Sequence, residues 1–145
     1  MSSRLGLFTI FTKYYKREDF SSREKWMETE REAVVAYLRY IVETRLKKHT
    51  PGLYTSLNLF SYMHRGRYIS DLIAENPGEF FNVLKNYFED EFVAMRMLRH
   101  ILKPLLDGGA EGEEAINRLI RGDKEGCLEI ATRVLREEAK RWAKR

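Results

Sequence analysis

Residues 21–49 read SSREKWMETEREAVVAYLRYIVETRLKKH and carry the strongest helical pattern in the chain. Apolar side chains recur here every three or four residues, as they do along one face of an α-helix. Ser21 and Glu24 match a capping box, in which each side chain accepts from a free backbone amide of the first turn. The basic residues 47–49 suit the negative end of the helix dipole, and Pro51 stops the helix. The apolar stripe is broad, which predicts a long helix packed against neighbours on more than one side.

The remainder of the chain shows the same kind of boundary signals. Thr50 and Asn76 each precede a proline, the order that is typical of a helix start. Asp123 is expected to cap the start of the last helix. Pro104 is expected to end or kink the helix that begins at Pro77. No turn dipeptide separates two alternating apolar runs, so hairpins have no support. The prediction is an all-α fold, a helical bundle of about five to six helices, with helices near 51–66, 70–75, 77–103, 113–121 and 123–144.

The first twenty residues form a separate unit in this prediction, ahead of a helical domain at 21–145. Basic and aromatic side chains alternate in LGLFTIFTKYYKR, residues 5–17. Their spacing allows a helix, while Thr9, Ile10 and Thr12 would also fit a strand. We therefore expect an extended or helical N-terminal arm.

Composition narrows the class of protein. No apolar run approaches the roughly 18–20 residues that cross a bilayer, and residues 1–11 lack the cleavage site of a signal peptide. The single cysteine, Cys127, has no partner for an internal disulfide and reads as a small buried residue. Glutamine is absent and Glu, Lys and Arg are abundant, a composition that favours a thermophilic source.

Motifs for catalysis or metal binding are missing. His49, His64 and His100 lie on three different expected elements, and none follows a glutamate by three residues, as a di-iron bundle requires. With one cysteine the chain has no set of cysteine and histidine residues spaced for a zinc site. It also has no phosphate-binding loop and no nucleophile elbow. The acidic residues 89–91 are adjacent, so on a helix their side chains point in directions about 100° apart and cannot converge on one substrate. We interpret them as part of a solvent-exposed face. We expect no enzyme, no catalytic residue, no metal and no cofactor.

Positive charge is concentrated at the front of the chain. Residues 1–17 hold four basic residues and no acid, and residues 1–50 hold eleven basic against seven acidic residues, which equals the whole net charge of +4. Such a distribution suits a polyanion better than a small ligand. Further basic clusters occur at 45–49 and 64–68. We predict that these residues bind nucleic acid: Arg4, Lys13, Tyr14, Lys16, Arg17, Arg23, Arg31, Arg39, Lys47, Lys48, Arg65 and Arg67.

The plan of the chain, a basic-aromatic arm running into a long helix from Ser21, resembles the major capsid proteins of filamentous viruses of hyperthermophilic archaea. The resemblance covers architecture and no diagnostic motif. It implies a structural virion protein whose N-terminal helices wrap DNA in A-form and whose C-terminal helices pack into a helical assembly, with itself or a paralogous subunit. Binding would be indifferent to base sequence, since phosphates carry no base code. The acid-rich stretch 24–32 departs from this plan.

A second interpretation is a small helical accessory subunit of a nucleic-acid-processing complex, similar to the small subunits of CRISPR effector complexes. The two interpretations place the protein in a virion or in the cytoplasm. Both expect nucleic acid as the partner, with DNA favoured, and neither expects a small-molecule substrate or a membrane span. A transcription factor has less support, because no compact helix-turn-helix with a basic recognition helix is found.

Overall fold

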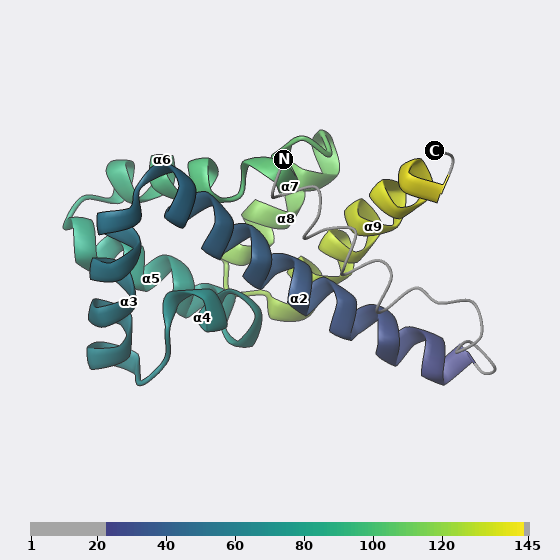
Figure 1. Ribbon diagram of the computed structural model, residues 1–145, viewed down its shortest axis with the longest axis horizontal. Helices are drawn as coiled ribbons and strands as arrows, with labels where there is room; N and C mark the ends of the chain where they lie inside the picture. Colours follow the sequence, from purple (N-terminus) through teal and green to yellow (C-terminus); the bar gives the residue numbers. More distant parts are fainter. Residues whose placement is uncertain (1–22, 144–145) are drawn as a thin grey trace.

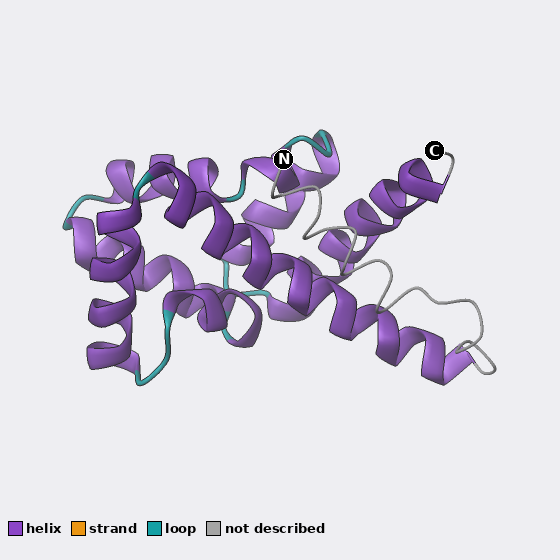
Figure 2. Ribbon diagram, in the orientation of Figure 1, coloured by secondary structure: helices purple, strands orange, loops and turns teal. Residues whose placement is uncertain are grey.

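A computed structural model describes the backbone of residues 23–143 and, within it, the side chains of residues 28–141. This part of the chain is entirely helical and contains no strand, which confirms the predicted all-α class (Figure 2). Eight helices are present between residues 23 and 143, more than the five to six that were expected. The N-terminal arm at 1–20 and the capping box at Ser21 lie outside the described residues.

The long helix α2, Arg23–His49, crosses the whole molecule and organises the rest (Figure 1). It packs against α3 (Pro51–Arg65), α4 (Ile69–Glu75), α6 (Glu91–Ile101) and α9 (Lys124–Ala143). This confirms the expectation of contacts on more than one side. The buried residues of α2 are Ala33, Val34, Tyr37, Leu38, Ile41, Val42 and Leu46, together with Glu30.

Local capping sets most of the helix boundaries as expected. The side chain of Asn76 accepts a hydrogen bond from the Glu79 amide at 3.3 Å and opens α5, Pro77–Phe88. Asp123 accepts one from the Gly126 amide at 3.0 Å and opens α9. Gly66 ends α3 at φ 70°, a conformation that costs glycine little because it has no Cβ.

The helix expected over 77–103 is wrong in one respect, because the structure breaks it in two. Glu89 adopts φ 56° and ends α5, and Asp90 then accepts from the amides of Phe92 and Val93 and opens α6. The acids 89–91 therefore flank a helix break and do not form a continuous helical face. After α6 ends at Ile101, Pro104 lies within the short helix α7, Lys103–Leu106.

The helix α8, Ala110–Ile120, begins three residues before its expected start and packs closely on α9. It also approaches α7 so closely that a Cβ added to Gly112 would lie 2.0 Å from the Leu105 carbonyl oxygen. The side chains Leu105, Ala115, Ile116, Leu119, Cys127, Ala131 and Leu135 close this end of the core. Residues that are far apart in sequence thus share one core around α2.

Candidate nucleic-acid interface

The twelve residues predicted to bind nucleic acid fall into three groups in the structure. Arg4, Lys13, Tyr14, Lys16 and Arg17, as well as the side chain of Arg23, lie outside the described residues. Four arginines carry carboxylate partners, and two lysines, Lys47 and Lys48, do not.

The four paired arginines contact acids on other helices or across a turn. Arg31 donates two hydrogen bonds to Glu125, at 3.0 and 2.9 Å. Arg39 pairs with Asp71 and Arg65 with Glu79, and Arg67 Nε lies 3.1 Å from Glu75 Oε2. A carboxylate at contact distance cancels most of the field that a distant phosphate would feel. These arginines are therefore poor candidates for the principal phosphate contacts.

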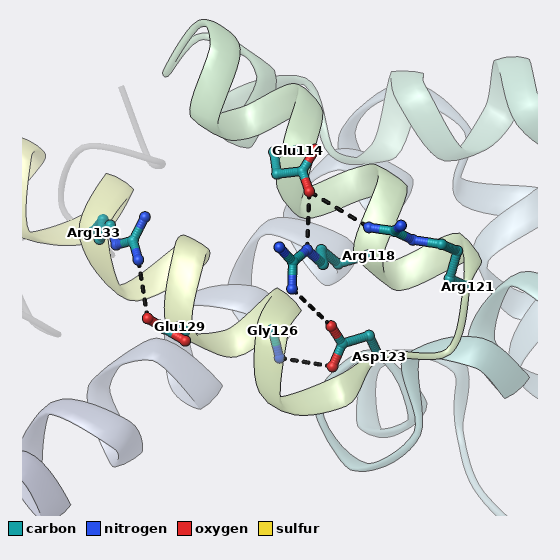
Figure 3. A network of polar contacts seen from close by, with 7 residues as sticks. All are labelled: Glu114, Arg118, Arg121, Asp123, Gly126, Glu129 and Arg133. Atoms are coloured by element: carbon teal, nitrogen blue, oxygen red, sulfur yellow. Dashed lines mark hydrogen bonds and ion pairs between the residues drawn. The ribbon is translucent and has the colours of Figure 1, made fainter.

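The turn between α8 and α9 is neutralised in the same way (Figure 3). Glu114 accepts from both Arg118 and Arg121, and Arg118 also donates to Asp123, which at the same time caps α9. Arg133 pairs with Glu129 one turn apart. This face of the molecule carries many cations and little net positive charge.

Six lysine and arginine side chains among residues 28–141 have no carboxylate within ion-pair distance: Arg45, Lys47, Lys48, Lys85, Arg96 and Lys124. The first three stand in the last two turns of α2, and Arg96 stands on α6, which packs against α2 (Figure 1). We call the surface made by Arg45, Lys47, Lys48, His49, Arg96 and His100 the α2–α6 basic surface.

Arg45 ties the two helices of this surface together. Its Nε donates to the His100 carbonyl oxygen at 3.2 Å, and its Nη1 lies 3.1 Å from His49 Nε2. The rings of His49 and His100 meet edge to face with centroids 5.4 Å apart. Burial lowers the pKa of His100, and the neighbouring Arg45 and His49 lower it further. On the outer side, Lys47 Nζ lies 5.1 Å from the centroid of the Tyr54 ring.

Two hollows flank the histidine pair. One, of about 310 Å³, is lined by Val93, Arg96, Met97 and His100. The other, of about 180 Å³, runs along α2 to Pro104 and includes Arg45, Lys48 and His49 in its wall. Cationic side chains thus border concave surface on both sides of the pair. This arrangement provides hydrogen-bond donors and positive charge for an anion, with no described carboxylate paired to Lys48 or Arg96.

A larger hollow of about 580 Å³ lies between α2 and α9, but four glutamates outnumber the three arginines in its wall. Arg31 and Arg136 in its wall pair with Glu125 and Glu30, and Arg136 Nη2 lies 2.6 Å from Glu30 Oε1. An anion entering there would have to displace a carboxylate that is already in place. The α2–α6 basic surface is therefore the better candidate for a polyanion.

Groups for other chemistry are not assembled in the described part of the chain. No set of three or more His, Cys, Asp or Glu side chains between residues 28 and 141 is placed to hold a metal ion. Cys127 is fully buried, and burial raises its pKa to about 12, which confirms the expectation of a buried packing residue. None of the described helices is both long and apolar enough to cross a bilayer.

Sequence reasoning noted the 45–49 cluster but missed Arg96 and His100. A usable signal was present, because residues 92–106 contain three basic residues and a histidine and no acid. Two of those basic residues, Arg99 and Lys103, pair with Glu113 and Asp107 in the structure, whereas Arg96 does not. Only the fold separates them. Comparison with known protein families, curated proteins and solved structures found no match for this chain.

Proposed function

We propose that this protein is a structural nucleic-acid-binding protein, a nucleoprotein or capsid subunit that packs DNA without reading its base sequence. The observation that carries the proposal is the α2–α6 basic surface. Most described cations are neutralised by acids. Four of the six that are not stand at the end of α2 or on α6, which packs against it: Arg45, Lys47, Lys48 and Arg96. The acid-free stretch 1–17, outside the described residues, contributes four more basic residues to the chain.

The proposed binding is electrostatic. Lysine and arginine that neutralise phosphates release condensed counterions, so affinity falls steeply with salt. Phosphate contacts position a nucleic acid and carry no sequence information. A surface that offers lysine, arginine and histidine, with no pattern of side chains suited to base edges in a groove, matches binding of this kind.

Assembly is the second part of the proposal, and it rests on exposed apolar side chains. Leu59, Tyr62 and Met63 on α3 are 60%, 54% and 71% exposed, and Phe92 at the start of α6 is 71% exposed. The stretch 50–63 has no charged residue, although a third of the whole chain is charged. Exposed apolar patches of this type mark surfaces that other chains cover.

The experiment is DNA binding as a function of salt, with matched charge variants. Lys48→Gln and Arg96→Gln should each weaken binding to duplex DNA of any sequence and reduce the salt slope by about one. Lys124→Gln is the control, because Lys124 also lacks a carboxylate partner but stands at the start of α9. A protein with no affinity for DNA at low salt, or equal effects of all three variants, would contradict the proposal.

A second candidate function, a helical accessory subunit in a nucleic-acid-processing complex, is favoured by the 180 Å³ hollow beside Pro104, because a hollow of this size suits one unpaired base. Electron microscopy of the purified protein with DNA separates the two. Filaments support the packing subunit, whereas a monomer that binds only single strands supports the accessory subunit.

A further inference from the structure

The hollow beside Pro104 is built along one side of α2. Tyr37, Ile41, Thr44 and Lys48 recur there every three or four residues and therefore share a helix face. Tyr40, Arg45 and His49 widen this face, and Pro104 closes the opposite wall. The hollow measures about 180 Å³. An engineered apolar cavity of about 150 Å³ is known to admit benzene, so this space suits one six-membered ring.

Tyr37 supplies an unused hydrogen-bond donor in this wall. The residue is 2% exposed, and its hydroxyl has no hydrogen-bond partner among the described residues. Burial raises the pKa of Tyr37, and the charges of Glu138 and Asp107 raise it further, so the hydroxyl stays protonated. A buried hydroxyl without a partner is costly, and such groups are usually satisfied in the functional state of a protein.

The opposite end of the hollow is positive. Arg45 stands eight residues after Tyr37, which is about 12 Å along the helix axis. Lys48 and His49 follow one turn later, and Lys48 has no carboxylate partner in the described part of the chain. A ligand that spans the hollow would thus contact the Tyr37 hydroxyl and aromatic rings at one end of the hollow. At the other end it would contact cationic groups.

We infer that this hollow holds one unpaired pyrimidine base of single-stranded nucleic acid, with Tyr37 donating to a ring carbonyl and the adjoining phosphate lying against Arg45 and Lys48. The inference rests on the phosphate binding proposed for the α2–α6 basic surface. It adds a subsite for an unpaired base, which the sequence-independent binding of duplex DNA does not use. The rings of Tyr40 and His49 and the face of Pro104 provide the flat, apolar contacts on which bases stack. Adenine has no ring carbonyl oxygen to accept a hydrogen bond from Tyr37, so the hollow should favour a pyrimidine over adenine.

The test measures fluorescence anisotropy with three probes of equal length, about fifteen nucleotides each. They are an oligothymidylate strand, an abasic strand with the same phosphates, and a duplex. The protein should bind oligothymidylate about tenfold more tightly than the abasic strand, the gain expected from one stacked and hydrogen-bonded base. A fourth probe, an oligoadenylate strand of the same length, should bind less tightly than the oligothymidylate strand.

Two variants locate the preference in the hollow. Tyr37→Phe should reduce it about fivefold, while the melting temperature stays level or rises, because an unpaired hydroxyl is removed. Thr44→Leu should abolish it by filling the space. The control is Tyr68→Phe, because Tyr68 is exposed and stacks on Tyr62 with centroids 5.3 Å apart. Duplex affinity should not change in any of the three variants.

The outcomes separate this inference from the function on which it rests. Equal affinity for the thymidylate and abasic strands, or a preference that survives both Tyr37→Phe and Thr44→Leu, overturns the base subsite while the phosphate-binding proposal stands. Failure of every probe to bind at low salt overturns both.

Discussion

Arg45 and His49 contact each other across one turn of α2, with Nη1 of the arginine 3.1 Å from Nε2 of the histidine. A guanidinium group only donates hydrogen bonds, so the ring nitrogen of His49 is the acceptor in this contact. The same arginine donates to the His100 carbonyl oxygen on α6. The group that holds the ends of the two helices together is therefore also the positive centre of the α2–α6 basic surface.

Stability should depend on pH through His100. The folded-state pKa of His100 is lowered, first by burial and then by Arg45 and His49. Between this lowered value and the unfolded value of about 6.5, the unfolded chain binds more protons. The stabilising contribution is complete above about pH 6.5 and is lost as the pH falls through the folded value. Urea unfolding between about pH 7.5 and pH 5 should show a smaller loss for His100→Gln than for the wild type.

The control for this pH series is His64→Gln, because His64 is exposed on α3 and is not part of the histidine pair. It should keep the pH-dependent loss that His100→Gln removes. Identical slopes for wild type and His100→Gln would show that His100 does not report on the contact between α2 and α6.

Removing Arg136 should be costly because it leaves a buried acid alone. Glu30 is 4% exposed, and both of its oxygens accept from the Arg136 guanidinium. Arg136→Met should lower the free energy of unfolding by about 1–3 kcal/mol, the cost of a buried group that loses its partner. Arg133→Met is the matched control on the same helix. Its partner Glu129 is exposed, so the loss should stay within about 0.5 kcal/mol.

Gly112 should not tolerate a side chain. A Cβ there would meet the Leu105 carbonyl oxygen at 2.0 Å, and that oxygen is backbone and cannot rotate away. Gly112→Ala should force α7 and α8 apart and destabilise the protein by about 1–3 kcal/mol in urea unfolding. Gly52→Ala is the contrast, because nothing lies within 4 Å of the added Cβ. An equal loss in both variants would contradict the steric explanation.

The break between α5 and α6 depends on Asp90. Its side chain accepts from the Phe92 amide at 2.8 Å and from the Val93 amide at 3.1 Å. Asp90→Ala should lower the free energy of unfolding by about 1 kcal/mol, the usual value of an N-cap. Glu89→Gly should leave stability unchanged or raise it, because glycine relieves the strain of φ 56°. A loss in both variants would show that the break is held by other contacts.

The apolar face of α3 should control assembly and not the fold of the single chain. Met63 is 71% exposed, so Met63→Glu removes little buried contact and should change the melting temperature only slightly. It should weaken self-association in analytical ultracentrifugation. The control is Ala110→Glu, an exposed position at the start of α8 and outside α3. If the wild-type protein is itself monomeric, or if both variants weaken self-association equally, this face is not an assembly surface.

Short-range signals in the sequence predicted most of the helices. Asn76 before Pro77 opens α5, Gly66 ends α3, and Asp123 opens α9, and each of these signals acts within four residues. The break at Glu89 was missed because it has neither glycine nor proline. There a capping aspartate competes with a sequence that reads as one continuous helix, and the packing of α6 against α2 accompanies the break.

The amino-acid sequence alone therefore determined the all-helical class seen over residues 23–143 and the concentration of positive charge at the front of the chain. Periodicity and caps are properties of neighbouring residues. Tertiary structure decided which cations are neutralised. Arg39 meets an acid 32 positions away, Arg31 one at 94 positions, and Arg136 one at 106 positions. A Coulomb interaction depends on distance in space, and no local pattern encodes that distance. Only the folded chain shows that Arg45, Lys48 and Arg96 keep their charge on one face.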